Sequence, residues 1–324
     1  MKKQSRIKRR RKKSFFRRFF TFILLIVLIL VGYGAYLAYN AYDAASGSYQ
    51  ELSRGDKSEL RDAEVAVTKD PISILIMGVE DYSTGGENGR TDTLMVATVD
   101  PDTKEIKLLS IPRDSRVDII GKGFKDKITH AHAYGGTDMT IDTVENFLNI
   151  PIDYYVKVNF DGFKDVIDEI GGITVDVPFD FTAHTDVPGG RAEFTEGEMR
   201  LDGTEALAYA RMRKSDPRGD FGRSDRQKQV IKAAMDEVSS AKGLMKLDDI
   251  AQHIGNNIET NLKPTELFAL QKKYSDVSSS KLESLSLNGV DQTIDGVYYF
   301  IPNEESVSNL SQKLSSILTD QSGE

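Results

Sequence analysis

The sequence predicts an α/β protein: a layered α–β–α domain with a mixed central sheet and a hairpin at its rim, preceded by one transmembrane helix. Three observations support this prediction. Short apolar, β-branched runs alternate with segments of helical periodicity, as in layered α/β folds. Gly and Pro residues separate many of these segments. A stretch of 21 residues without charge, residues 19–39, precedes them all.

The composition excludes several classes of protein. The chain has 324 residues, of which 39% are hydrophobic and 28% charged, so it is neither mainly disordered nor collagen-like. The absence of Cys excludes disulfide bonds, thiolate nucleophiles and Cys-ligated metals. Residues 1–18 carry 11 Lys and Arg and no acid, whereas the other 306 residues carry 31 Lys and Arg against 50 Asp and Glu. The basic end and the acidic body therefore belong to different environments.

Residues 1–18 are predicted to be a cytoplasmic tail, and residues 19–39 a transmembrane signal-anchor helix. A helix of this length spans about 31 Å, which matches the hydrocarbon core of a bilayer. The positive-inside rule keeps the tail in the cytoplasm and places the body outside, as a single-pass type II protein of the cell membrane. A cleaved signal peptide is the alternative, although its small-residue cleavage signal is weak. Nucleic-acid binding by the tail is a further alternative, and we favour contact with anionic membrane lipids.

The body is predicted to begin after a polar, charged stalk, residues 40–70, and to occupy residues 71–318 ahead of a polar tail, residues 319–324. The predicted strands are Ile72–Val79, Thr93–Val99, Ile106–Ile111, Tyr154–Val158, Ile173–Val177, Leu282–Leu287 and Gly296–Ile301. The predicted helices are Met139–Leu148, Phe160–Ile170, Thr204–Met212, Arg223–Val238, Thr265–Tyr274 and Glu304–Leu318. Residues 100–104 form a turn signal, Gly171 and Gly172 end a helix, and the Gly-rich segment Phe179–Leu201 is the predicted rim hairpin.

One arginine stands at the end of a predicted strand. Arg113 lies in Ser110-Ile-Pro-Arg-Asp114, where Pro112 ends the strand. Open α/β sheets bind ligands at the carboxyl ends of their strands. Arg113 is therefore a candidate ligand-binding residue, and a surface ion pair with Asp114 is the alternative.

A second group of cations flanks the junction of two predicted helices. These residues are Arg211, Arg213, Arg223 and Arg226. The last two fall in the predicted first turn of a helix, where each positive charge costs about 0.3–1 kcal/mol. A bound phosphate would offset this cost, because helix N-termini and guanidinium forks both bind phosphate oxygens. Gln227 follows Arg223 by four residues on the same helix face. A surface salt-bridged to Asp220 and Asp225 is the alternative.

Two carboxylates, a lysine and two histidines complete the candidate residues. Asp81 follows the first predicted strand and Asp92 precedes the next, so the two could hold Mg²⁺ or Mn²⁺ against phosphate oxygens. One of these carboxylates could also take a proton from an attacking hydroxyl, and ordinary turn acids near Arg90 are the alternative. Lys127 could add a phosphate contact. His130 and His132 are too few for a zinc site and are read as structural. No Walker-type loop is present, so ATP use is not expected.

With these motifs in this order, the sequence resembles the LytR–CpsA–Psr family of membrane-anchored phosphotransferases. The resemblance covers about residues 71–240, together with the tail and anchor. The motifs that carry it are Gly89-Arg-Thr-Asp-Thr93, Ser110-Ile-Pro-Arg-Asp114, Lys127 ahead of Tyr134-Gly-Gly136, Val158-Asn-Phe-Asp-Gly-Phe163, Tyr209-Ala-Arg-Met-Arg213 and Asp220-Phe-Gly-Arg-Ser-Asp-Arg-Gln227. Two positions depart from the family pattern: Tyr82 stands where many members have Arg, and Thr129 where they have Asn.

The resemblance implies a glycopolymer phosphotransferase that acts outside the membrane. It would move an anionic polymer of the wall teichoic acid class from undecaprenyl diphosphate to the muramic-acid 6-hydroxyl of peptidoglycan, with no nucleic-acid partner. By analogy the diphosphate is held by Arg113, Arg211, Arg213, Arg223 and Gln227, supported by Lys127 and Arg226, while Asp81 and Asp92 hold the metal ion. Among these residues Asp92, Arg113 and Arg223 are the catalytic candidates, and an apolar slot takes the polyprenyl tail. A diphosphate hydrolase with the same site and a non-catalytic wall-polymer binding or regulatory protein are the alternatives.

Overall fold

The computed structural model describes residues 42, 46–80, 89–239, 257–275 and 277–319. The chain divides into two compact units, Met1–Asp43 and Ala44–Glu324, and all the elements below belong to the second. The predicted tail and transmembrane helix lie outside the described residues. No helix within the described ranges is long and apolar enough to cross a bilayer.

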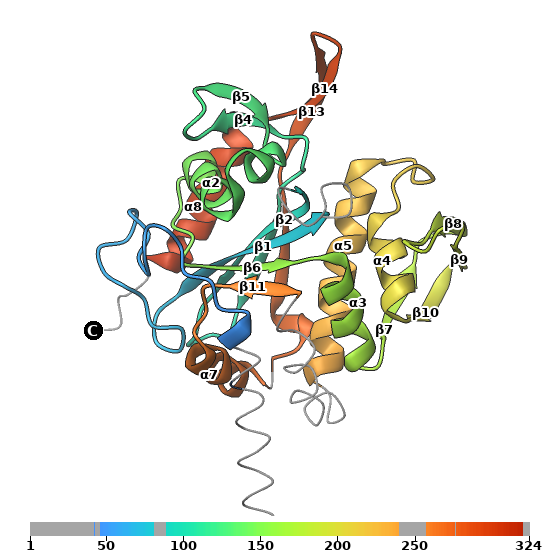
Figure 1. Ribbon diagram of the computed structural model, residues 1–324, viewed down its shortest axis with the longest axis horizontal. Coiled ribbons are helices and arrows are strands. Elements are labelled where there is room, and N and C mark those ends of the chain that lie inside the picture. The colour runs from blue at the N-terminus through green and yellow to red at the C-terminus, as the bar shows by residue number, and fades with distance from the viewer. Residues whose placement is uncertain (1–41, 43–45, 81–88, 240–256, 276, 320–324) are drawn as a thin grey trace, which may run out of the picture. The chain divides into compact units, whose positions relative to one another are not determined.

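A six-stranded mixed sheet forms the centre of the second unit (Figure 1). Its strands, in spatial order, are β11 (Ile258–Thr260), β6 (Tyr154–Val158), β1 (Ile72–Glu80), β2 (Arg90–Val99), β3 (Ile106–Ser110) and β12 (Leu282–Ser286). The pairs β1–β6 and β3–β12 are parallel, and the other three pairs are antiparallel. The predicted mixed sheet is therefore confirmed.

Helices cover both faces of this sheet, and the alternation of side chains along β1 shows why. Leu75, Met77 and Val79 of β1 are buried in one apolar core, together with side chains from two helices. Ile72 and the half-buried Ile74 belong to a core on the opposite face. The helices of the first face are α2 (His130–Leu148) and α8 (Glu304–Leu318); those of the second are α7 (Pro264–Tyr274) and α5 (Asp220–Ser239). The result is the predicted α–β–α layering.

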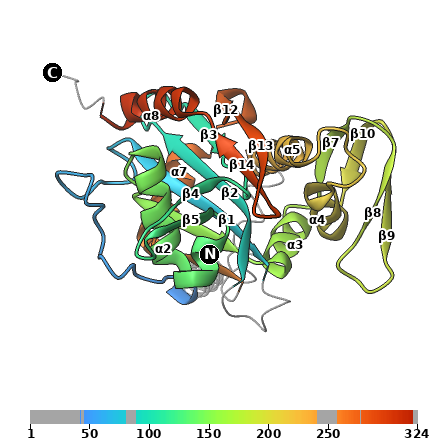
Figure 2. The ribbon, with the colours of Figure 1, turned by 90° about the horizontal axis from the view of Figure 1, so that it is seen from above.

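A smaller group of helices and strands lies beside the main sheet (Figure 2) and encloses a second apolar core. It is built from α3 (Phe160–Glu169), β7 (Ile173–Val177), β8 (Phe181–His184), β9 (Arg191–Phe194), β10 (Gly197–Leu201), α4 (Gly203–Arg211) and part of α5. Gly171 and Gly172 end α3 with positive φ angles of 95° and 87°, a conformation that favours glycine. The predicted rim hairpin is the β8–β9 pair, whereas β10 returns to pair with β7.

Several elements differ from the sequence prediction. Helix α5 begins at Asp220, three residues earlier than predicted, so Arg226 lies in its second turn rather than its first. Helix α2 begins at His130, and its backbone departs from helical geometry at Gly135 and Gly136. Two hairpins were not predicted: β4 (Arg116–Ile119) with β5 (Phe124–Lys127), and β13 (Gly289–Ile294) with β14 (Val297–Pro302), of which only the second strand was expected.

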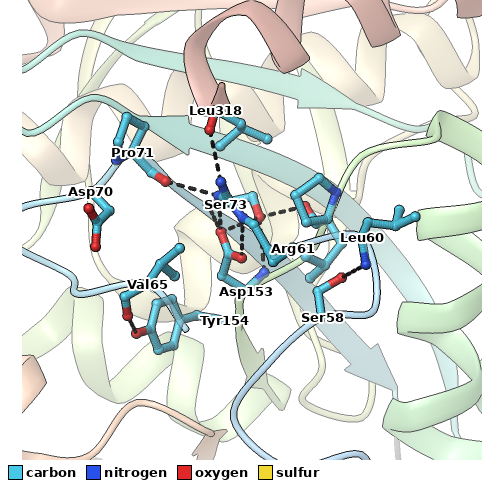
Figure 3. A network of polar contacts seen from close by, with 12 residues as sticks. Ser58, Leu60, Arg61, Val65, Asp70, Pro71, Ser73, Asp153, Tyr154 and Leu318 are labelled. Carbon is cyan, nitrogen blue, oxygen red and sulfur yellow. Dashed lines mark hydrogen bonds and ion pairs between the residues drawn. The ribbon is translucent and has the colours of Figure 1, made fainter. Parts of the chain in front are cut away.

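The segment Ser46–Asp70, expected to be a stalk, packs against the body instead. Leu52 and Val67 are buried in two of its apolar cores. Arg61 donates hydrogen bonds to both carboxylate oxygens of Asp153, at 2.9 and 2.6 Å, and to the carbonyls of Pro71 and Leu318 (Figure 3). Because Asp153 also accepts a bond from the amide of Ser73, one buried carboxylate joins three distant stretches of chain. The described part of this segment is thus an integral part of the domain.

Replacing Arg61 by alanine is expected to lower the free energy of unfolding by about 3 kcal/mol, because the buried Asp153 carboxylate would lose its charged partner. Equilibrium denaturation in urea measures the change. Lys263→Ala is the matched control, since it removes an exposed ion pair with Asp56 of the same segment and should cost less than about 1 kcal/mol. Equal losses of stability in the two variants would contradict the role of Arg61 as the charged partner that stabilises the buried Asp153 carboxylate.

Candidate functional site

A cavity of about 680 Å³ opens where β1, β2 and β6 meet the helices α3, α4 and α5. Its polar lining includes Asp92, Thr93, Arg113, Arg211, Arg213, Arg223 and Gln227. Its apolar lining includes Ile76, Met77, Val158, Phe160, Phe163, Leu207, Ala208, Ala210, Met212, Val230 and Ile231. Six of the nine predicted site residues therefore lie around one cavity, although they come from four separate stretches of sequence.

Arg113 lies in the loop just after β3 and is positioned by two carboxylates. Its Nη1 lies 2.5 Å from Asp92 Oδ1 on β2, and its Nε lies 3.7 Å from Asp114 Oδ2. Burial alone would lower the pKa of Arg113, but the Asp92, Asp114 and Asp220 carboxylates outweigh this effect and raise it. Arg113 is therefore a permanent positive charge, held at the cavity by acids on either side.

Arg223 is the most buried cation among the cavity-lining residues, with a side chain 8% exposed. Its Nη2 lies 2.6 Å from Asp220 Oδ1 in the first turn of α5, and its buried Nε makes no hydrogen bond to any described residue. Burial lowers the pKa of Arg223; Asp220 opposes this shift, and the positive charges of Arg113 and Arg213 add to it. Like charges gathered in this way favour the binding of an anion, which would offset their mutual repulsion.

The other predicted cavity residues are held by short local structures. Asp202 caps α4 by accepting a bond from the amide of Glu205 in a capping box, and this helix ends at Arg211 beside the cavity. The Arg211 guanidinium lies 4.3 Å from the centre of the Phe160 ring. The Arg213 side chain is 40% exposed, and its Nε lies 3.7 Å from Asp220 Oδ1. Gln227 Nε2 donates to Thr93 Oγ1 at 2.8 Å and so links α5 to β2.

Two predicted phosphate contacts do not line the cavity. The Arg226 side chain is 1% exposed and donates hydrogen bonds to Asp216, to the carbonyl of Met212 and to the carbonyl of Tyr209. These three acceptors lie at the end of α4 and in the loop that follows it. Arg226 therefore stabilises the loop between α4 and α5 and does not face the cavity. Lys127 lies on β5 with its Nζ 2.8 Å from Asp114 Oδ1. Its influence on the cavity passes through Asp114, which also faces Arg113.

The other candidate residues are Asp81, proposed as a metal ligand, and the two histidines. Asp81 lies outside the described residues. Within the described ranges, no group of three or more His, Asp and Glu side chains could hold a metal ion. His130 Nδ1 lies 2.8 Å from Asp126 Oδ2, and His132 Nδ1 lies 2.7 Å from the carbonyl of Gly89. Burial lowers the pKa of His132 despite that hydrogen bond. These contacts agree with the prediction that both histidines have a structural role.

Sequence reasoning missed two parts of the site. Asp220 was considered only as a rival to bound phosphate, whereas it orients both Arg213 and Arg223 at the cavity. Its spacing of three residues from Arg223 within one helix was the signal that could have found it. The β8–β9 hairpin was expected only at the rim, yet its residues Ala183 and His184 line the cavity. No local pattern in the sequence indicates that contact.

A three-layer α/β domain with cations around a cavity of largely apolar wall has the features that suit an amphipathic anion. The family model described as the LytR_cpsA_psr family matches residues 35–316, and the chain belongs to this family.

Named relatives and solved structures agree with this assignment. The chain is 52% identical over 291 residues to the polyisoprenyl-teichoic acid–peptidoglycan teichoic acid transferase TagV of Bacillus subtilis (strain 168), covering 88% of this chain and 74% of that protein. It is 43% identical over 287 residues to TagU of the same organism, covering 88% and 91%. The structure of the family protein YwtF (TagT), with bound octaprenyl pyrophosphate lipid, matches with a TM-score of 0.67 at 33% identity, covering 83% and 99%.

Proposed function

We propose that this protein is a glycopolymer phosphotransferase that moves a wall teichoic acid from undecaprenyl diphosphate to the muramic-acid 6-hydroxyl of peptidoglycan. The observation that carries this proposal is the cavity, in which Arg113, Arg211, Arg213 and Arg223 border an apolar wall. A lipid diphosphate matches this arrangement, because its charged head group would face the arginines and its hydrocarbon tail the apolar wall. Relatives are named teichoic acid transferases, and a related structure holds octaprenyl pyrophosphate.

The cavity residues supply positioning and electrostatic stabilisation. The acceptor oxygen forms a bond to the sugar-linked phosphorus while the bond from that phosphorus to the leaving polyprenyl phosphate breaks. Negative charge develops on the phosphoryl oxygens and the leaving group, and Arg113 and Arg223 stabilise it at fixed positions in a partly water-excluded site. The acceptor hydroxyl loses its proton to a base, for which we propose Asp92. No nucleotide is required, because the diphosphate linkage already stores the driving force.

A divalent cation is part of this proposal. Asp92 presents carboxylate oxygens at the cavity, the hard donors that Mg²⁺ and Mn²⁺ prefer. We propose that Asp92 holds such an ion together with Asp81, and that the ion, when bound, offsets charge on the phosphate oxygens. Calorimetric titration of Mg²⁺ alone should show weaker binding to Asp92→Asn than to the wild type, and equal binding would remove Asp92 from the metal site.

The membrane anchor is also a proposal, supported by residues 1–39 of the sequence. The uncharged run 19–39 follows a strongly basic tail, which favours a cytoplasmic N-terminus and an extracellular body. This orientation would keep the cavity near the bilayer that carries its lipid donor. The full chain should then resist carbonate extraction from cell membranes, and its release by carbonate alone would argue against an uncleaved anchor.

The transferase and the diphosphate hydrolase use the same cavity and differ in the acceptor. Purified lipid-linked teichoic acid should be incubated with the protein, with and without peptidoglycan. We expect polymer to become covalently attached to peptidoglycan and polyprenyl phosphate to be released in equal amount. Release of free polymer at the same rate whether or not peptidoglycan is present would instead favour the hydrolase, and no release in either case would favour a binding or regulatory protein.

A further inference from the structure

The β8–β9 hairpin forms one wall of the cavity. Four consecutive residues, Thr182–Thr185, line the cavity and run from β8 into the turn that joins it to β9. The two strands form a separate two-stranded sheet at the outer edge of the smaller group of elements (Figure 2). Because the strands pair with each other, the position of this wall depends on side-chain contacts with the helices.

Apolar packing holds the base of the hairpin. The Phe181 ring stacks on that of Tyr209 in α4, with ring centres 5.9 Å apart. Further along the same face, Ala183 is the last residue of β8 that is buried in this core. The cavity-lining residues His184 and Thr185 come after it. A different contact therefore has to hold the outer half of the hairpin.

An ion pair with α3 makes that contact. Asp186 lies in the turn of the hairpin, and Lys164 of α3 donates a hydrogen bond to its Oδ2. Lys164 Nζ also lies 2.9 Å from Oδ1 of Asp161, one turn earlier on α3. The Lys164 side chain is 20% exposed and that of Asp186 10%, whereas that of Asp161 is 53% exposed. Lys164 therefore joins the hairpin to α3 at a largely buried point.

The charge of Asp186 is compensated by this lysine. The other carboxylate oxygen of Asp186, Oδ1, is buried and makes no hydrogen bond to a described residue. Burial alone would lower the pKa of Lys164, but hydrogen bonds to Asp186 and Asp161 raise it, so the lysine stays charged. A buried carboxylate that has lost its cation is stabilised by reaching water. Removal of the Lys164 charge would therefore release the turn of the hairpin from α3.

We infer that Lys164 is a positioning residue for the lipid donor, because its ion pair with Asp186 holds His184 and Thr185 in the wall of the cavity. The inference rests on the proposed function and deepens it. Neither Lys164 nor Asp186 lines the cavity, so the pair acts through the hairpin. A released hairpin loses contacts with the donor but leaves the cavity arginines in place.

The affinity of the full chain for geranylgeranyl diphosphate measures this effect. We expect Lys164→Ala and Asp186→Asn each to raise the dissociation constant at least fivefold. Lys164→Arg keeps the positive charge and should restore the affinity to within twofold of the wild type. Asp161→Asn is the matched control, since Asp161 pairs with the same lysine but belongs to α3 and not to the hairpin. Its affinity should also stay within twofold of the wild type.

Two further measurements separate positioning from a general loss of structure. In Lys164→Ala, amide hydrogen exchange should become faster in β8 and β9, while the amides of α4 and α5 stay as protected as in the wild type. In the transfer assay with peptidoglycan, the KM for the lipid-linked polymer should rise and kcat should stay within twofold, because Arg113, Arg223 and Asp92 are untouched.

Unchanged donor affinity in both Lys164→Ala and Asp186→Asn would overturn the inference. So would an equal loss in Asp161→Asn, faster exchange throughout the domain, or a fall in kcat at constant KM. Failure of the proposed function has a different signature. The wild type itself would then bind no diphosphate, and the inference would fail with it, whereas the inference alone fails when wild type and variants bind the diphosphate equally well.

Discussion

Replacing Arg223 by alanine is expected to weaken binding of a polyprenyl diphosphate by roughly 1.5–3 kcal/mol, the range for hydrogen bonds to charged groups. This loss corresponds to about a 10- to 150-fold higher dissociation constant. The physical reason is that Arg223 is buried at the cavity beside Arg113, with its Nε making no hydrogen bond to a described residue. Calorimetry or fluorescence titration with geranylgeranyl diphosphate measures the change.

Two further variants make the Arg223 result interpretable. Arg223→Lys keeps the positive charge but loses the planar fork, so it should recover only part of the affinity. Arg200→Ala is the control, because Arg200 is half exposed and pairs with Glu237 away from the cavity. Donor affinity equal to that of the wild type in Arg223→Ala would remove Arg223 from the site.

Replacing Asp216 by alanine is expected to lower the free energy of unfolding by about 3–5 kcal/mol, the usual cost of leaving a buried charge without its partner. The Asp216 side chain is 0% exposed, and that of Arg226 only 1%. The substitution would leave the Arg226 guanidinium buried with two carbonyl acceptors and no countercharge. Urea denaturation at neutral pH measures the loss, and a change below about 1 kcal/mol would contradict the structural role given to this pair.

The same pair predicts a dependence of stability on pH. Burial alone would raise the pKa of Asp216, but hydrogen bonds from Arg226 and the amide of Arg218, together with the charges of both arginines, hold it below 3.8. A carboxylate whose pKa is depressed by folding adds stability above its unfolded pKa and loses it as pH falls through the folded value. The stability gap between the wild type and Asp216→Asn should therefore be constant above about pH 5 and shrink below about pH 4. A gap that persists unchanged into strong acid would mean that the charge is not the cause.

Much of the central sheet could be predicted, because its strands are apolar, β-branched and bounded by turn residues. The first three strands and the last helix fall close to their predicted ranges. The β4–β5 hairpin could not be predicted in this way, since Phe124–Lys127 is a four-residue strand with three charged side chains. Such strands form because tertiary contacts hold them, and local propensity carries little of that information.

The segment Ser46–Asp70 was misread for a related reason. Arg54 and Arg61 give it the composition of a solvated stalk, yet they pair with Glu145 and Asp153, some ninety positions further along the chain. Composition reports the charges of a segment but not their partners. Only the folded arrangement shows that these charges are largely buried.

In the candidate site too, the sequence did not show where every single side chain points. Arg223 was identified because its charge opposed the dipole of the predicted helix, and it does meet Arg113, Arg211 and Arg213 at one cavity. Arg226 satisfied the same criterion and yet points into the loop between α4 and α5. It precedes Gln227 by one residue and is therefore turned about 100° around the helix. Once α5 begins at Asp220, the face shared by Arg223 and Gln227 is the one toward the cavity.

The most direct test of this account is the electron density of a crystal of the domain soaked with a polyprenyl diphosphate. The account predicts density for the diphosphate within hydrogen-bond distance of Arg113 and Arg223, and for the hydrocarbon tail along Phe163 and Leu207. Density for the lipid on any other face, or a tail that leaves the cavity empty, would contradict it.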